Sequence, residues 1–292
     1  MNISFSGCGF LGIYHIGVAS AIKEYAPDIC GKLCGASAGA IAASALLCDC
    51  LGKSRHNILL YYCCFQMLGQ AVTYVCHGSE LISVLFIPFF NFCCLDHVSS
   101  RFLSVAIEAR SRALGPLHPS FDLVKIVRDG LTKGLPENAH KLATGRLFVS
   151  LTRLSDGANV LASEFDTKEE LIEAIICSMF IPLYSGAIPP CYKGTHFIDG
   201  GWSNNLPVLD ENTVTVSPFS GEADICPLDS DSSFLMSFDI KNTNIRFTCE
   251  NFHRLSVALL PPHPEVLSKM CRQGFQDALR FLTKNSKWFF HT

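Results

Sequence analysis

The chain has 292 residues, of which 49% are hydrophobic and only 17% are charged, and its formal net charge is −3. Globular domains average about 25% charged residues, so this composition favours an apolar substrate or surface, while the negative net charge argues against nucleic-acid binding. The length provides for one α/β domain with a large core, and no second domain is indicated.

The fifteen cysteines would suggest disulfide bonds in a short secreted protein. The chain is long, however, and its first lysine is Lys23, so the N-terminus lacks the basic region of a signal peptide. There is no C-x-x-C pair, and adjacent pairs such as Cys63-Cys64 are poorly spaced for structural zinc. We therefore expect reduced thiols, a cytoplasmic location and neither a metal nor another cofactor.

Strand and helix patterns alternate along the chain, which predicts a mostly parallel sheet with helices on both faces. Strands are expected near residues 2–6, 31–35, 146–154, 159–163, 196–199 and 213–217. Helices are expected at about 12–26, 38–50, 100–113, 121–133, 167–178, 245–258 and 264–283. Ser155–Ala158 has the composition of a hairpin turn between the third and fourth strands.

The first strand runs into a glycine loop, Gly7–Gly12, with the sequence G-C-G-F-L-G. Glycines allow backbone N–H groups to face an anion. The spacing also fits a dinucleotide fingerprint, but that motif needs an acidic residue after the second strand, and Asp28 precedes it. We therefore interpret the amides of Gly7, Cys8 and Gly9 as an oxyanion hole.

The second strand ends in a G-x-S-x-G pentapeptide, Gly35–Gly39, which is followed by a helix of small residues. This context is typical of a nucleophile elbow, a tight strand-to-helix turn that exposes the serine Oγ. Side chains at Gly35 or Gly39 would collide with the neighbouring backbone. Small residues also simply allow a helix to pack closely on a sheet, so the pentapeptide alone is a weak signal. Ser37 is the first candidate nucleophile.

A carboxylate follows the fifth expected strand in the segment Phe197–Gly201, with the sequence F-I-D-G-G. Asp-Gly is in the first place a turn signal, but a serine hydrolase also needs a group that accepts the Oγ proton. His196 points away from Phe197 on its strand, and His253 and His263 lie in a C-terminal part without a supporting motif. We therefore interpret Asp199, on the turn with Gly200 and Gly201, as the base of a Ser-Asp dyad.

These three loops resemble the motifs that define the patatin-like phospholipase family, in particular its animal branch of adipose triglyceride lipase and adiponutrin. The resemblance covers about residues 1–48 and 99–284. It includes Leu114–Phe121, Ser150–Arg153, Phe180–Pro182, Ile188–Pro190, Ser217–Gly221 and Asp224–Pro227. It implies a three-layer α/β/α fold with a mostly parallel central sheet and a Ser-Asp dyad without histidine.

The resemblance implies a serine lipid acyl hydrolase that cleaves carboxylic esters of acylglycerols, with Ser37 as nucleophile and Asp199 as base. A second glycerol hydroxyl can replace water, so transacylase activity is expected beside hydrolysis, and phospholipids are a further family-type substrate. Because an aspartate with a pKa of about 3.9 is a poor base at neutral pH, we expect apolar surroundings to favour its neutral form. Candidates for these surroundings are Phe10, Phe180, Ile181 and Phe197.

The same resemblance implies a lipid droplet or membrane surface and a protein co-activator as partners. A catalytically impaired paralogue that binds droplets or partners remains the alternative, because Gly31 and Lys32 make a poor buried strand before the elbow. A displaced strand would leave Ser37 misaligned. A conventional Ser-His-Asp esterase is a third hypothesis, in which one histidine is essential.

We expect one domain at residues 1–284 and a short tail at 285–292. An apolar, cysteine-rich insertion at about 53–98 interrupts the domain and has no counterpart in the relatives. Its uncharged runs are too short or too polar to span a bilayer. It is a hairpin that dips into a lipid monolayer, a lid over the site, or translated intron, and we favour the last because the flanking helical regions otherwise join smoothly.

Overall fold

A computed structural model describes residues 1–48, 97–112, 115–118, 120–229 and 236–285. The insertion expected at about 53–98 therefore lies almost wholly outside the described residues, as does most of the tail expected at 285–292. No helix in the described ranges combines the length and apolar character that a membrane span requires.

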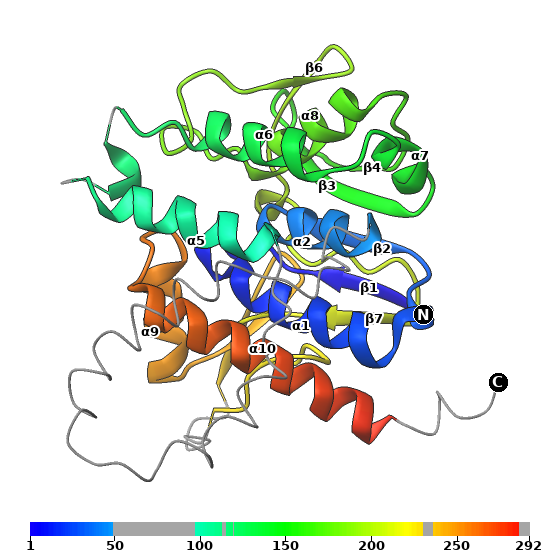
Figure 1. The fold of residues 1–292 in the computed structure, drawn as a ribbon, viewed down its shortest axis with the longest axis vertical. Coiled ribbons are helices and arrows are strands. Elements are labelled where there is room, and N and C mark those ends of the chain that lie inside the picture. Colours follow the sequence, from blue (N-terminus) through cyan, green and yellow to red (C-terminus); the bar gives the residue numbers. More distant parts are fainter. Residues whose placement is uncertain (49–96, 113–114, 119, 230–235, 286–292) are drawn as a thin grey trace, which may run out of the picture.

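The centre of the fold is a seven-stranded sheet in the order β5-β6-β3-β2-β1-β7, with β4 paired to β3 (Figure 1). Four strands run parallel to their neighbours: β1 (Asn2–Phe5), β2 (Leu33–Ala36), β3 (Leu147–Arg153) and β7 (Thr213–Val216). Three pair antiparallel at one side: β4 (Asn159–Ala162), β5 (Cys191–Tyr192) and β6 (Thr195–Asp199). The prediction of an α/β fold with a mostly parallel sheet is confirmed.

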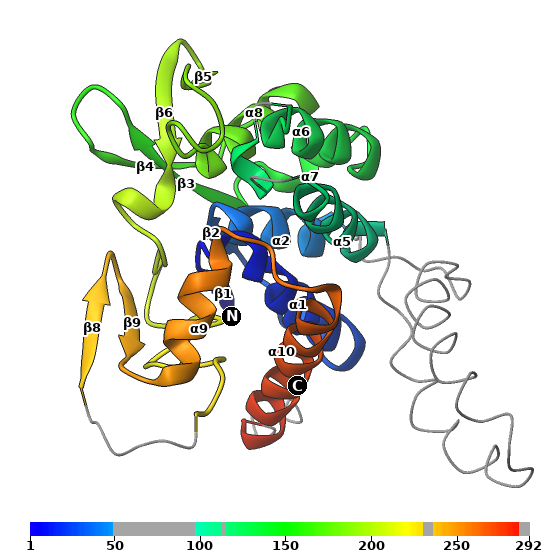
Figure 2. The same cartoon turned by 90° about the vertical axis from the view of Figure 1, so that its left-hand side faces the viewer.

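Helices pack on the sheet and on one another. The bounds are α1 (Gly12–Tyr25), α2 (Ala38–Leu47), α5 (His97–Arg110), α6 (Leu123–Gly134), α7 (Ala139–Ala143), α8 (Lys168–Met179), α9 (Cys249–Ala258) and α10 (Pro264–Lys284). Helix α2 contacts β1, β2 and β3, α8 contacts β3 and β6, and α10 lies along α1. Figure 2 shows α2, α5, α6 and α10 to one side of the sheet, and a two-stranded hairpin, β8 (Ser237–Ile240) and β9 (Thr243–Arg246), on the other.

Two expected elements differ from the structure. The helix expected at 245–258 begins only at Cys249, because residues 243–246 form β9. Lys241 and Asn242 close that hairpin with φ of 48° and 67°, as a two-residue type I′ loop requires, although Lys-Asn is not its usual sequence. The strand expected at 31–35 begins at Leu33, and Lys32 is exposed before it. Lys32 is therefore not buried without a partner, contrary to what a strand over residues 31–35 would have required.

The strand register explains why two distant loops meet. Ala36, the last residue of β2, pairs with Ser150 on β3, while Asp199 at the end of β6 pairs with Leu151 on the other side of β3. Ser37 directly follows β2 and Asp199 ends β6, and these two strands lie on either side of the same part of β3. One central strand therefore brings together residues that are far apart in the sequence.

Candidate active site

Ser37 occupies the tight turn between β2 and α2. Its φ of 54° and ψ of −125° are rare for a residue other than glycine. A Cβ on Gly35 would lie 2.6 Å from the backbone carbon of Gly39, and a Cβ on Gly39 would lie 2.2 Å from the carbonyl oxygen of Phe5. Both glycines are therefore required by the close approach of the turn to its neighbours, and the geometry is that of a nucleophile elbow.

Asp199 lies directly against this serine. The side chains of Ser37 and Asp199 lie close enough for the Ser37 hydroxyl to stabilise the Asp199 carboxylate, and the amide of Gly201 donates to Oδ1 at 2.7 Å. Burial of the carboxyl raises its pKa from the ordinary 3.8 to about 6, against the opposite effect of the Ser37 hydroxyl and the Gly201 amide. The elevated pKa agrees with the expected burial of the base, since only 6% of Asp199 is exposed.

The loop that carries Asp199 is held by its backbone. The amide of Asp199 donates to the carbonyl oxygen of Phe180 at 2.9 Å, and Thr152 Oγ1 donates to the carbonyl oxygen of Asp199 at 2.8 Å. A Cβ on Gly200 would lie 2.1 Å from the carbonyl oxygen of Ser150. The carboxylate therefore projects from a turn that is fixed between β3 and the end of α8.

The glycine loop after β1 lies beside the elbow, since a Cβ on Gly7 would come within 3.2 Å of Ser37 Cβ. The Gly7 amide is already engaged, because it donates to the carbonyl oxygen of Asn205 at 3.2 Å. Among the described residues, the amides of Cys8, Gly9 and Ala38 have no hydrogen-bond acceptor. The structure thus leaves two of the three amides expected from the sequence available, and adds that of the residue after the nucleophile.

Gly9 and Gly12 also have structural roles in this loop. Gly9 has φ of 55°, and a Cβ there would lie 2.1 Å from the carbonyl oxygen of Ala258, so no other residue fits. Gly12 begins α1. The loop is therefore clamped between the elbow and the end of α9.

Asn205 was not recognised from the sequence. Its carbonyl oxygen accepts from the Gly7 amide and its Nδ2 donates to the Gly7 carbonyl oxygen at 3.2 Å. Both polar groups of Gly7 are thereby bonded to one residue that follows the Asp199 turn. The only sequence signal is its place six residues after Asp199, in a loop where an asparagine is ordinary.

No histidine completes a triad in the part of the chain that the structure describes. His196, His253 and His263 are exposed. His15 is buried, and its Nε2 lies 2.8 Å from the carbonyl oxygen of Ser6, which makes Nε2 the protonated nitrogen. Burial lowers its pKa to about 4, so the ring is neutral at physiological pH. The dyad interpretation fits this arrangement, and His15 supports the start of the glycine loop.

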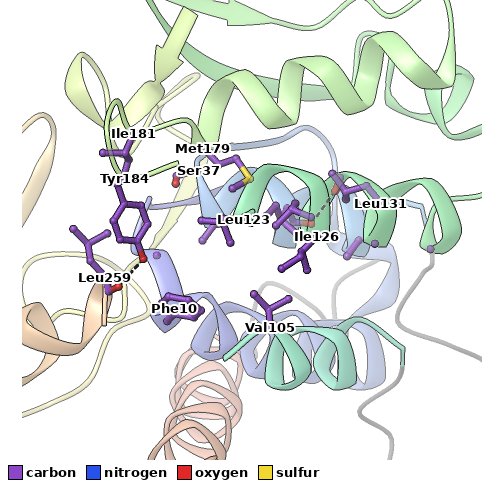
Figure 3. Close-up of a pocket in the computed structure, with 18 of the residues that line it drawn as sticks. Phe10, Ser37, Val105, Leu123, Ile126, Leu131, Met179, Ile181, Tyr184 and Leu259 are labelled. Carbon is purple, nitrogen blue, oxygen red and sulfur yellow. Dashed lines mark hydrogen bonds between the residues drawn. The ribbon is translucent and has the colours of Figure 1, made fainter. Parts of the chain in front are cut away.

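An apolar cavity opens from Ser37 (Figure 3). Its walls come from α2, α5, α6, the end of α8 and the end of α9, and none of the described residues that line it is charged. They include Phe10, Ile41, Ala45, Val105, Leu123, Ile126, Val127, Leu131, Leu135, Met179, Ile181 and Leu259. The wall along α6, from Leu123 to Leu135, extends about 18 Å at 1.5 Å per helical residue.

One end of the cavity is bridged by a hydrogen bond. Tyr184 Oη donates to the carbonyl oxygen of Leu259 at 2.6 Å, and Figure 3 shows this pair beside Phe10 at the end opposite Leu131. The two segments that meet here follow α8 and α9. They border the cavity at this end.

Comparison with known proteins identifies the family. Residues 3–211 match the family model of the patatin-like phospholipases. The chain belongs to the patatin-like phospholipase family. The matched residues contain the glycine loop, the serine turn and the aspartate turn that the fold brings together around Ser37. Among the described residues no cluster of His, Cys, Asp and Glu could hold a metal ion.

Similar curated proteins place the chain in the predicted animal branch. It is 47% identical over 288 residues to patatin-like phospholipase domain-containing protein 2 of Homo sapiens, covering 97% of this chain and 48% of that protein. It is 39% identical over 288 residues to 1-acylglycerol-3-phosphate O-acyltransferase Pnpla3 of Mus musculus, covering 97% and 59%. The chain spans about half the length of these relatives.

The crystal structure of VipD from Legionella pneumophila is a more distant likeness. Its TM-score is 0.45 at 15% identity, covering 97% of this chain and 66% of that chain. The family assignment does not depend on it.

Proposed function

We propose that the chain is a serine lipid acyl hydrolase that cleaves carboxylic esters of acylglycerols through an acyl-enzyme on Ser37, with Asp199 as base. The observation that carries the proposal is the placement of Ser37, on a strained strand-to-helix turn, beside the buried Asp199 carboxylate and in the wall of an uncharged, apolar cavity. The nucleophile, the base and a cavity for a hydrocarbon chain thus lie next to one another.

The chemistry follows from these positions. Asp199 accepts the Ser37 proton while Oγ bonds to the ester carbonyl carbon, and the free amides of Cys8, Gly9 and Ala38 stabilise the oxyanion. The C–O bond to the alcohol then breaks, and the alcohol leaves with the proton from Asp199. Water, or the hydroxyl of a second acylglycerol, attacks the acyl-enzyme with the same carboxylate as base, which gives hydrolysis or transacylation.

The pKa of Asp199 suits this role. At about 6 it leaves the carboxylate mostly ionised at pH 7, yet makes it a far stronger base than an ordinary aspartate. A proton taken from Ser37 is therefore held more favourably than on an exposed carboxylate. No histidine is needed for this transfer.

The cavity supports a long acyl chain as the bound group. Its wall along α6 is about 18 Å long, close to the roughly 15 Å of hydrocarbon that one bilayer leaflet contributes. The absence of charge from the described lining disfavours a polar substituent on that chain. The bound group is therefore an unmodified fatty acyl chain.

We also propose that this end of the cavity is the substrate entrance and docks on a lipid droplet or membrane, and that the protein is a cytoplasmic enzyme that associates peripherally with that surface. The segments 179–191 and 255–262, which meet at the Tyr184–Leu259 bond, contain no charged residue. Leu183 is 88% exposed and Ile188 is 82% exposed. Leu183 also has φ of 68°, a strained conformation for a bulky side chain, in a turn closed by a bond from its amide to Gly186.

No described observation favours the catalytically impaired alternative. That hypothesis was based on a displaced strand before the elbow, whereas β2 begins after Lys32 and is fully buried. A third hypothesis, the Ser-His-Asp esterase, requires a histidine beside Ser37. His15 is bonded to Ser6, whereas His196, His253 and His263 are exposed, and no described histidine is bonded to Ser37 or Asp199.

The proposal is tested by fatty-acid release from emulsified long-chain triacylglycerol, with diacylglycerol and phospholipid as comparison substrates. Wild type and Ser20→Ala, which loses only a hydroxyl bonded within α1, are expected to release fatty acid. Ser37→Ala is expected to release none, and Asp199→Asn very little. Equal release by Ser37→Ala and wild type would contradict the assignment.

Docking is tested by flotation with a triacylglycerol emulsion coated with zwitterionic phospholipid. Leu183→Asp is expected to lower the bound fraction several-fold while leaving hydrolysis of a dispersed short-chain ester unchanged, because a charge must be desolvated on insertion. Leu154→Asp is the control, since Leu154 is also exposed but lies at the β3–β4 turn. Equal losses in both variants would exclude a specific docking face.

A further inference from the structure

One three-residue segment at the end of α8 is bonded to both members of the dyad. The Ser37 amide donates to Ser178 Oγ at 2.8 Å, and the Asp199 amide donates to the carbonyl oxygen of Phe180 at 2.9 Å. Neither bond uses a reacting atom, so Ser37 Oγ and the carboxylate remain free to bond each other. The spacing between the two loops is therefore set by one short segment, the three residues at the end of α8.

Ser178 Oγ is itself held in a fixed direction. It donates to the carbonyl oxygen of Ser150 on β3 at 2.7 Å, and Ser178 is completely buried. A hydroxyl has one proton, so donation to Ser150 leaves a lone pair for the Ser37 amide. The Ser150 carbonyl is also the atom against which Gly200 packs. The chain of bonds from β3 through Ser178 to Ser37 therefore starts at the point that also supports the Asp199 turn.

The elbow needs such support. Ser37 has φ of 54° and its side chain makes no capping hydrogen bond to the first turn of α2. A sparsely populated conformation persists only where the surroundings determine it. The bond from Ser178 is a contact to the Ser37 backbone from a different element, and the local sequence of the elbow does not supply it.

We propose that Ser178 is a positioning residue of the dyad, whose hydroxyl, oriented by the Ser150 carbonyl, sets the alignment of Ser37 Oγ with the Asp199 carboxylate. The inference rests on the proposed roles of Ser37 and Asp199. It concerns a residue that touches neither substrate nor reacting atoms.

The loss of this hydroxyl has two separate consequences. A displacement of the nucleophile by about 1 Å can lower the rate roughly 100-fold, so Ser178→Ala is expected to lower kcat by about that factor with little change in KM. A displaced Ser37 hydroxyl would also stabilise the Asp199 carboxylate less, and this hydroxyl is one of the two groups that lower the pKa of Asp199. The acid limb of kcat/KM is then expected to move above pH 6, because the neutral carboxyl is favoured further.

The experiment measures kcat, KM and the pH profile of kcat/KM for a dispersed 4-nitrophenyl fatty-acid ester in the full chain. Fluorophosphonate titration gives the fraction of competent sites. The variants are Ser178→Ala and Ser178→Cys, since the thiol keeps the size of the side chain but bonds weakly. Thr167→Ala is the matched control: its hydroxyl accepts the Glu170 amide at 3.1 Å at the other end of α8.

The expected result is a graded loss of kcat, largest for Ser178→Ala and intermediate for Ser178→Cys, with a raised acid limb in both. Thr167→Ala is expected to lose thermal stability alone. An unchanged kcat and limb in Ser178→Ala would overturn the inference. A loss of kcat that the lower folded fraction explains in full, with the acid limb of kcat/KM at the wild-type pH, would also overturn it. If Ser178→Ala does not fold, the same readouts on Ser178→Cys decide. A wild type that neither labels nor hydrolyses would instead contradict the proposed function itself.

Discussion

The serine elbow and the wall of the apolar cavity tolerate change very differently, as two glycines show. A Cβ on Gly39 would lie 2.2 Å from the carbonyl oxygen of Phe5, whereas a Cβ on Gly134, in the cavity wall, would meet nothing within 4 Å. The elbow is held by close contacts between backbones, which leave no room for a side chain at its glycines, and by the bond from Ser178. The cavity is shaped by side chains, which can be exchanged. Catalytic geometry is thus set by the fold, and the fit to the acyl chain by replaceable residues.

The sharpest test of this contrast is alanine at the elbow. Gly39→Ala is expected to lower the free energy of unfolding by about 3 kcal/mol, because the colliding partner is backbone and cannot rotate away. Labelling by a fluorophosphonate should be lost as well. Gly134→Ala is the control and is expected to leave stability unchanged or raise it by up to about 1 kcal/mol. Urea denaturation checks both, and a Gly39→Ala variant as stable as wild type would refute the contrast.

Asp199→Asn should separate catalytic geometry from stability. The folded-state pKa of about 6 lies above the ordinary 3.8, so this carboxyl contributes stability below pH 3.8 that is lost as the pH rises through 6. Above pH 6 the buried charge costs about 3 kcal/mol. Asparagine removes that cost, so the variant is expected to unfold at higher urea than wild type at pH 8. The gain should shrink by about half at pH 5, and a gain independent of pH would contradict the assigned pKa.

The activity of the wild type is expected to follow the same ionisation. Because Asp199 must be ionised to accept the Ser37 proton, kcat/KM should fall below pH 6, about tenfold per pH unit. An ordinary aspartate would instead keep activity constant down to about pH 4. The profile is measured with a dispersed ester whose own solubility is independent of pH.

The smallest expected effect lies in the cavity. Gly134→Leu adds a side chain to the lining, so hydrolysis of long acyl esters should fall several-fold while short acyl esters are unaffected. Lys133→Leu adds the same side chain one residue earlier, at an exposed position outside the lining, and should change neither. The ratio of kcat/KM for the two ester lengths is the readout. Equal ratios in Gly134→Leu and wild type would mean that the acyl chain does not reach α6.

The sequence was most informative where the backbone leaves no choice of residue. Gly35, Gly39 and Gly200 are dictated by approaches of 2.1 to 2.6 Å, and such glycines leave a pattern that can be read without the fold. Ser37 and Asp199 could be predicted because they stand inside those patterns.

Other parts of the site could not be predicted because they depend on tertiary contacts. The Gly7 amide donates to the carbonyl oxygen of Asn205. Ser178 accepts from the Ser37 amide, although the two residues are 141 positions apart in the sequence. The cavity residues Val105 and Leu131 are ordinary apolar helix positions, which look the same whether they pack or line a space. Only the arrangement of the helices distinguishes the two.

The most direct test of the account is fluorophosphonate labelling of the full chain followed by peptide mass spectrometry. We predict a single adduct on the peptide that contains Ser37, absent in Ser37→Ala and strongly slowed in Asp199→Asn. An unlabelled wild type that is folded, or an adduct on a different serine, would contradict the claim that Ser37 and Asp199 form a working dyad.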